Sequence, residues 1–204
     1  DGGYIVTGCS SIECTGESDL VMMKFDIKGN LLWTQIYDFV EGNIGGYSII
    51  EKSQGNGYAI TGTKSGDILL ISTDGDGEIG WEKTYHFYGN DIGRSLIQTS
   101  DYGYVIVGKN GADAQIIKTN LLGDIVWETS YGNSVSNDIA YSIIENINNE
   151  FIITGSVYVT GSNTEVFLIK ISADGELIWE KTYGASGYDM AFDVIETNDS
   201  GYAI

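Results

Sequence analysis

Residues 164–204 read TEVFLIKISADGELIWEKTYGASGYDMAFDVIETNDSGYAI, and this stretch holds the pattern that decides the fold. An apolar run is followed by a Gly, then by a Trp four residues later and a Tyr four residues after that. The same order occurs four times, with tryptophans at positions 33, 81, 127 and 179 and therefore at spacings of 48, 46 and 52. Such periods are typical of repeat architectures, so the chain holds four copies of one unit.

Three further markers keep the same place in every copy. The Gly is Gly29, Gly77, Gly123 or Gly175, and the Tyr is Tyr37, Tyr85, Tyr131 or Tyr183. An acidic residue precedes each apolar run, namely Asp19, Asp67, Asp113 or Glu165. Coincidence of so many markers at one spacing excludes chance similarity.

Each copy contains four strand patterns and no helical periodicity. In one copy the strands are GRSLIQTS (93–100), GYVIVGKN (103–110), AQIIKTN (114–120) and DIVWETSY (124–131). They are rich in Ile, Val, Tyr and Thr, and turn residues bound them. Connections this short require antiparallel hairpins, because parallel pairing needs a long crossover. The sequence therefore predicts an all-β fold, a β-propeller of about four four-stranded antiparallel blades.

The predicted blades cover residues 1–44, 45–90, 91–137, 138–188 and 189–204, approximately, within one repeat region. The first blade lacks its first strand, and the last contains a single first strand at about 190–198. We expect a segment of a larger propeller or repeat array rather than a closed four-bladed ring. The four tryptophans are expected to be largely buried between adjacent sheets, since a single blade cannot be stable alone.

The composition narrows the classes of protein. The 204 residues include 29 acidic and 10 basic side chains, with a formal net charge of −19, which repels nucleic acid and anionic lipid. At 42% hydrophobic, the chain is too apolar for general disorder, and no apolar run reaches the roughly 20 residues that span a bilayer. The chain starts at Asp1 without an initiator Met, so we expect a processed or excised piece.

The copies also resemble a known repeat. GGYIVTG, followed by DLVMMKFDIKGNLLWTQIY and GGYSIIEKSQGNGYAITG, is similar to the β-propeller repeat found in secreted and surface proteins of bacteria and archaea. Two positions depart from that repeat, where Ser72 replaces a Lys and Ile44 replaces an Asp. The resemblance implies a scaffold at the cell surface or outside the cell, and it supplies no catalytic residues.

Two groups of carboxylates are candidate sites. Asp91, Asp138 and Asp189 recur where the chain enters the innermost strand, so they could hold a polar ligand or cation at the channel mouth; the alternative is that each caps its own turn. Asp74, Asp76 and Glu78 crowd one hairpin turn and could bind Ca²⁺ weakly. The alternative there is a solvated turn closed by its own hydrogen bonds, with no cofactor.

Cysteine and histidine are scarce. Cys9 and Cys14 could form a small loop-closing disulfide or remain two thiols, and with one His in the chain they cannot complete a zinc site by themselves. His86 stands at the place of Asp38, Gly132 and Gly184 in the other copies. Its spacing to other residues indicates no catalytic partner.

Three hypotheses for function follow. The leading one is a non-catalytic extracellular or cell-surface scaffold whose loops bind protein or glycan ligands. The second is a propeller enzyme with a carboxylate site in the channel, which would need several convergent groups from different blades. The third is a structural array that self-associates through its terminal strands. Neither nucleic-acid binding nor membrane insertion is expected.

Overall fold

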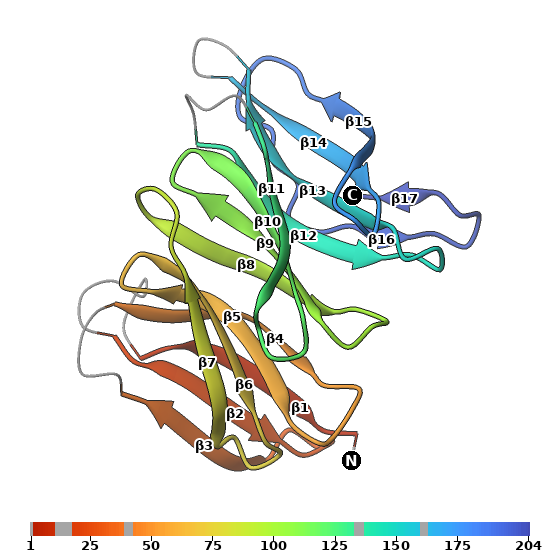
Figure 1. Ribbon diagram of the computed structural model, residues 1–204. Helices are drawn as coiled ribbons and strands as arrows, with labels where there is room; N and C mark the ends of the chain where they lie inside the picture. The colour runs from red at the N-terminus through yellow and green to blue at the C-terminus, as the bar shows by residue number, and fades with distance from the viewer. Residues whose placement is uncertain (1, 11–17, 39–42, 133–136, 160–162) are drawn as a thin grey trace. The chain divides into compact units, whose positions relative to one another are not determined.

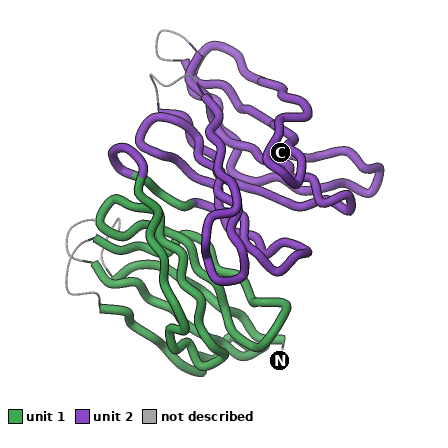
Figure 2. The backbone as a smooth tube through the Cα atoms, in the orientation of Figure 1, with its two compact units in different colours: residues 1–86, 91–93 green, residues 87–90, 94–204 purple. Residues whose placement is uncertain are grey.

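The computed structural model describes residues 2–10, 18–38, 43–132, 137–159 and 163–204. All the regular elements in these ranges are β-strands, as the sequence predicts (Figure 1). None of the described residues forms a helix that could cross a membrane. The chain divides into two compact units: Asp1–His86 with Asp91–Gly93, and Phe87–Asn90 with Arg94–Ile204 (Figure 2).

The first unit holds two antiparallel sheets. Their strand orders are β1-β2-β3 and β4-β5-β6-β7, so every strand pairs with its neighbour in sequence. The strands are β1 (Tyr4–Cys9), β2 (Leu20–Phe25), β3 (Leu31–Tyr37), β4 (Ile44–Glu51), β5 (Tyr58–Lys64), β6 (Asp67–Thr73) and β7 (Ile79–Tyr85).

The second unit holds two four-stranded antiparallel sheets and a short hairpin, in the orders β8-β9-β10-β11, β12-β13-β14-β15 and β16-β17. The strands are β8 (Asp91–Gln98), whose first three residues belong to the first unit, β9 (Tyr104–Asn110), β10 (Asp113–Thr119), β11 (Ile125–Tyr131), β12 (Ile139–Glu145), β13 (Phe151–Tyr158), β14 (Thr164–Ile171), β15 (Leu177–Tyr183), β16 (Ile195–Glu196) and β17 (Tyr202–Ala203). The single strand expected at 190–198 is instead the two-residue β16, and the chain continues into β17.

One β-bulge recurs between the last two strands of the three-stranded sheet and of each four-stranded sheet. The ladder shifts at Lys24/Phe25, Ser72/Thr73, Lys118/Thr119 and Lys170/Ile171. The residue just before each Trp is left unpaired, and from the Trp onward the strand alternates regularly. The bulge therefore fixes which side of the outer strand the Trp and Tyr occupy.

The cores lie between successive sheets of each unit. In the first unit, residues of β2, β4, β5 and β6 form one cluster of fully buried side chains, including Leu20, Met22, Ile44, Ile60 and Leu69. In the second, the larger cluster joins β9, β10, β12, β13 and β14 and centres on Phe151 and Phe167. The two middle strands of the sheets β4–β7 and β8–β11 are buried almost throughout, because both of their faces are covered.

The tryptophans lie at equivalent places on β3, β7, β11 and β15, and most of the surface of each is buried, as the sequence predicts. A smaller part of each ring stays exposed, because the last strand forms the edge of its sheet. Within the units the rings pack on an aromatic ring of the next sheet: Trp33 on Tyr58, Trp127 on Phe151 and Trp179 on Tyr202, with centroids 6.3, 6.2 and 6.2 Å apart.

Candidate functional site

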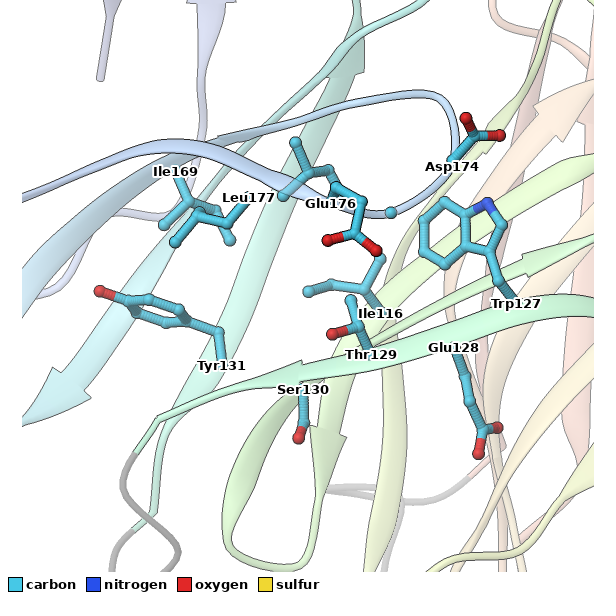
Figure 3. A pocket seen from close by; sticks show the side chains of 12 residues that line it. Ile116, Trp127, Glu128, Thr129, Ser130, Tyr131, Ile169, Asp174, Glu176 and Leu177 are labelled. Carbon is cyan, nitrogen blue, oxygen red and sulfur yellow. The ribbon is translucent and has the colours of Figure 1, made fainter.

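The outer strand β11 turns three side chains toward the next sheet of the second unit. Trp127, Thr129 and Tyr131 alternate with the exposed Glu128 and Ser130, which point away in Figure 3. This alternation follows from the regular pleat after the bulge. The three inward side chains form one wall of a pocket.

The pocket has a volume of about 430 Å³ and lies between β11 and the β14–β15 hairpin. The rings of Trp127 and Tyr131 stand at its opposite ends, and the Glu176 carboxylate lies between them (Figure 3). Residues four apart on a strand have α-carbons about 13 Å apart, so the pocket is elongated. Its apolar lining comes from Ile116, Ile169, Ile171 and Leu177. This pocket is hereafter the open groove.

Trp127 is held by the turn of the following hairpin. Its Nε1 donates a hydrogen bond to the Ala173 carbonyl at 2.9 Å. Gly175 lies against the indole with φ of +84°, and a Cβ there would come within 2.9 Å of the ring. The Gly and Trp markers are therefore linked across sheets within each unit, because Gly175 makes room for Trp127 as Gly77 does for Trp33.

Tyr131 closes the other end of the open groove. Its ring lies 4.9 Å from that of Phe167, centroid to centroid. Burial raises the pKa of Tyr131 to about 12, and the negative charge of Glu180 and a hydrogen bond to it act in the same direction. The phenol therefore stays protonated at neutral pH and can donate a hydrogen bond.

The rim of the open groove is acidic. Ser172 Oγ accepts hydrogen bonds from the backbone N–H groups of Asp174 and Glu176, at 3.3 and 3.2 Å, and so closes the turn. The turn places both residues at the groove, with the Glu176 carboxylate turned into it and that of Asp174 turned away (Figure 3). Two aromatic ends, an apolar lining and carboxylate acceptors suit a ligand with apolar faces and hydroxyl or ammonium donors.

The equivalent place in the first unit is filled. Gln35 stands where β11 has Thr129, and its Nε2 donates to the Asp76 carbonyl at 3.2 Å and to Glu78 Oε1 at 3.1 Å. Tyr37, only 9% exposed, donates from its hydroxyl to the Gly77 carbonyl at 2.6 Å. The Gln35 amide thus fills the space in the first unit that corresponds to the open groove beside the shorter Thr129 in the second unit.

The three aspartates predicted at the channel mouth make different contacts. Asp138 is fully buried and accepts the Tyr158 N–H at 2.6 Å, and the half-buried Asp189 accepts the Ala185 N–H at 2.9 Å. Asp91 is also fully buried, in the first unit, where its N–H donates to the Gly66 carbonyl at 2.7 Å. The Asp189 contact, with the N–H four residues earlier, is that of the turn-capping alternative, whereas Asp138 bonds to the end of β13; a shared ligand stays a prediction.

The carboxylates of the hairpin turn are used within the fold. Asp74 Oδ1 accepts the N–H groups of Asp76 and Glu78, at 3.0 and 2.9 Å, while Glu78 accepts from Gln35. Among the described residues, the group of potential metal ligands that lie together does not include this turn. These contacts agree with the alternative of a turn closed by its own hydrogen bonds, and a cation site at Asp74, Asp76 and Glu78 stays a prediction.

The remaining predicted residues are at the start and the middle of the chain. Cys9 ends β1, and Cys14 lies outside the described residues, so their disulfide stays a prediction. His86 follows β7 directly, and its Nδ1 lies 2.8 Å from Asp67 Oδ1. The hydrogen bond and negative charge of Asp67 raise the pKa of this imidazole.

Sequence reasoning concentrated on carboxylates and missed the open groove. The signal that could have found it is the residue midway between each Trp and Tyr, which is Gln35, Lys83, Thr129 or Lys181. Thr129 is the shortest of the four. Its significance depends on packing across two sheets, which periodicity alone does not reveal.

Two solved structures share this arrangement of sheets. A protein of unknown function from Bacteroides caccae, in a crystal structure at 1.35 Å resolution, aligns with a TM-score of 0.62 and 11% identity, over 99% of this chain and 64% of its own. The Dos1 propeller aligns with a TM-score of 0.57 and 10% identity, over 97% of this chain and 49% of its own. The chain folds as a segment of a β-propeller.

The propeller fold predicted from the sequence is thus confirmed. No family model and no curated protein sequence matches the chain, so the finer resemblance to a repeat of secreted proteins stays a prediction. The chain spans 64% and 49% of the lengths of these two proteins. At about 10% identity the likeness concerns the scaffold and not the ligand.

Proposed function

We propose that this chain is part of a non-catalytic, extracellular or cell-surface β-propeller scaffold that binds carbohydrate in the open groove. The observation that carries the proposal is the open groove itself, with Trp127 and Tyr131 at its ends and the Glu176 carboxylate between them. Its volume falls in the range of small-ligand sites, about 300–1,000 Å³.

The chemistry of the groove favours an oligosaccharide. The C–H faces of sugar rings pack on aromatic rings, and sugar hydroxyls donate to carboxylates. A separation of about 13 Å between the α-carbons that carry the two rings suits a ligand of two or three linked sugars. An extended peptide could also reach both rings, but the acidic rim would repel its acidic side chains and favour basic ones.

A glycan array probed with the chain tests the proposal. The matched variant is Thr129→Gln, which introduces the side chain that fills the equivalent place beside Gly77 in the first unit. We expect the wild type to bind an oligosaccharide class and the variant to lose that binding while remaining folded. Absence of any oligosaccharide binding, or binding only to basic peptides on a parallel array, would contradict the proposal.

The enzyme alternative is separated by following the bound glycan over time. Glycoside hydrolysis uses two carboxyl groups about 5–9.5 Å apart on either side of the scissile bond. Mass spectrometry of the incubated oligosaccharide should show it intact. Cleavage that disappears in Glu176→Gln would show that the groove is catalytic.

A further inference from the structure

Two carboxylates and the only histidine of the chain meet at one edge of the second sheet of the first unit. Asp67 begins β6, His86 follows β7, and Asp91 begins β8. Ile68 pairs with Tyr85, so Asp67 and His86 extend from adjacent strands at the same edge. The hydrogen bond from the Asp91 N–H to the Gly66 carbonyl, 2.7 Å long, brings the third residue to the same place.

The three side chains offer one imidazole nitrogen and two carboxylate oxygens that all lie within 4.8 Å of one another. His86 Nδ1 and Asp67 Oδ1 are 2.8 Å apart. Zn–N and Zn–O bonds of about 2.0–2.2 Å place neighbouring ligand atoms about 3–4 Å apart. Small side-chain rotations would therefore bring all three atoms to bonding distance from one ion.

The corresponding places in the second unit have the carboxylates but no imidazole. Gly132 stands where the first unit has His86, and a Cβ there would come within 2.1 Å of Asp138 Oδ2 and 2.9 Å of Asp113 Oδ1. At Gly184, a Cβ would meet Glu165 Cγ at 2.7 Å and Asp189 Oδ2 at 2.8 Å. The repeat thus brings two carboxylates toward one backbone position, and at one copy that position carries a nitrogen ligand.

The three ligands differ in exposure, and the difference suits a metal ion that keeps open coordination positions. Asp91 is fully buried, whereas the side chains of Asp67 and His86 are 29% and 74% exposed. An ion bound to the buried Asp91 would still be open to solvent on the side of Asp67 and His86, where water completes the coordination.

We propose that Asp67, His86 and Asp91 form a binding site for a divalent first-row transition cation, with Zn²⁺ as the probe. Two carboxylates with one imidazole suit Zn²⁺ or Mn²⁺ better than Ca²⁺, which takes oxygen ligands alone. The ion would join the start of β6, the end of β7 and the start of β8. The competing interpretation is an ion pair of His86 with Asp67 that binds no metal.

The single histidine makes a direct test simple. Zn²⁺ is titrated into the full chain while the imidazole resonances are followed by NMR, since all of them belong to His86. We expect saturable shifts of these resonances and a rise in the melting temperature. The readout does not respond to Zn²⁺ bound at the cysteines or at scattered carboxylates. Unmoved imidazole resonances at saturating Zn²⁺ would overturn the proposal.

Three variants complete the test. His86→Gly carries the residue found at Gly132 and Gly184, so it should fold, and it should lose the Zn²⁺-dependent rise in melting temperature. Asp67→Asn should lose it as well, and its imidazole resonances should no longer respond. Glu51→Gln, an exposed charge at the end of β4, is the matched control and should behave as the wild type. An undiminished stabilisation of His86→Gly by Zn²⁺ would equally contradict the site.

Discussion

Each unit has a contact between successive sheets that is built from the same positions of the repeat. In the first unit side chains fill the space at this contact, whereas in the second unit the space stays open as a groove. In the first unit Trp33 packs on Tyr58, and in the second Trp127 packs on Phe151. The difference lies midway between Trp and Tyr, where Gln35 reaches Glu78 but Thr129 is too short to reach Glu176. The Trp and Gly positions serve packing, which leaves the middle position to set the shape of the surface.

The buried lysines beside these tryptophans show the same variation. Lys24 and Lys118 are the strand partners of Trp33 and Trp127. Lys24 lies over the Tyr58 ring, 5.8 Å from its centroid, whereas Lys118 pairs with Asp101 at 2.9 Å. Both contacts thus have a lysine ammonium group beside the indole, but the group that the ammonium contacts differs between them. Substitutions at equivalent positions can therefore compare the two contacts.

The largest effect is expected at the Trp position, which both contacts have in common. Trp127→Ala removes the packing on Phe151 and the hydrogen bond to Ala173, and should lower the free energy of unfolding by about 2–3 kcal/mol, less than for a fully buried Trp. Trp127→Phe keeps a ring and should cost about 1 kcal/mol. Urea denaturation measures both. A loss below about 0.5 kcal/mol for Trp127→Ala would make the indole a surface group.

The next effect distinguishes the two tyrosines. Tyr37→Phe leaves the buried Gly77 carbonyl without its 2.6 Å donor and should cost about 1–2 kcal/mol, more than Tyr131→Phe at the half-buried equivalent place. Burial raises the pKa of Tyr37 to about 12, with smaller contributions from Glu78 and Asp74.

This raised pKa gives a pH dependence. The stabilisation is fully present below the unfolded-state pKa of about 10 and is lost as the pH rises through about 12. Denaturation between pH 9 and pH 12 should therefore show a fall in the free energy of unfolding that is smaller in Tyr37→Phe. Equal slopes in the two proteins would mean that the Tyr37 hydroxyl is not held as described.

Exchanging the middle residues should affect stability less and ligand binding more. Gln35→Thr loses two exposed hydrogen bonds and should cost about 0.5–1 kcal/mol, while Thr129→Gln should change the free energy of unfolding by less than about 0.5 kcal/mol. Thermal denaturation checks both. A large destabilisation of Thr129→Gln would show that the two contacts are not equivalent.

A similarly small effect is expected at the Lys118–Asp101 pair. Burial acts to raise the pKa of Asp101, but hydrogen bonds from Thr99, Lys118 and the Gly103 N–H lower it to about 2. The stabilisation is present above pH 4 and is lost as the pH falls through about 2. Asp101→Asn should remove this acid dependence and cost under about 1 kcal/mol, because the carboxylate is 66% exposed. An unchanged acid profile would contradict the pairing.

The fold could be predicted because its signals are local and repeated. The Trp-to-Tyr spacing, the hairpin glycines and the short connections specify antiparallel sheets without knowledge of any distant contact. One point differs from the prediction: the strand expected at 190–198 is only the two-residue β16 (Ile195–Glu196), which pairs with β17.

The candidate site could be predicted only in part. The sequence identified Asp91 and His86 separately, but their meeting with Asp67 depends on which strand ends share an edge. The open groove depends on the length of one side chain against a hairpin about 45 residues away in sequence. The carboxylates recur along the chain, but which residues meet in space is seen only once the strands are paired into sheets.

The account is tested most directly by following the four indole N–H resonances while the oligosaccharide selected on the glycan array is added. The proposed site predicts a saturable shift of the Trp127 resonance, with that of Trp33 unmoved, and no shift of either in Thr129→Gln. A shift at Trp33 with Trp127 unmoved, or the same Trp127 shift in Thr129→Gln, would contradict the assignment of the open groove as the binding site.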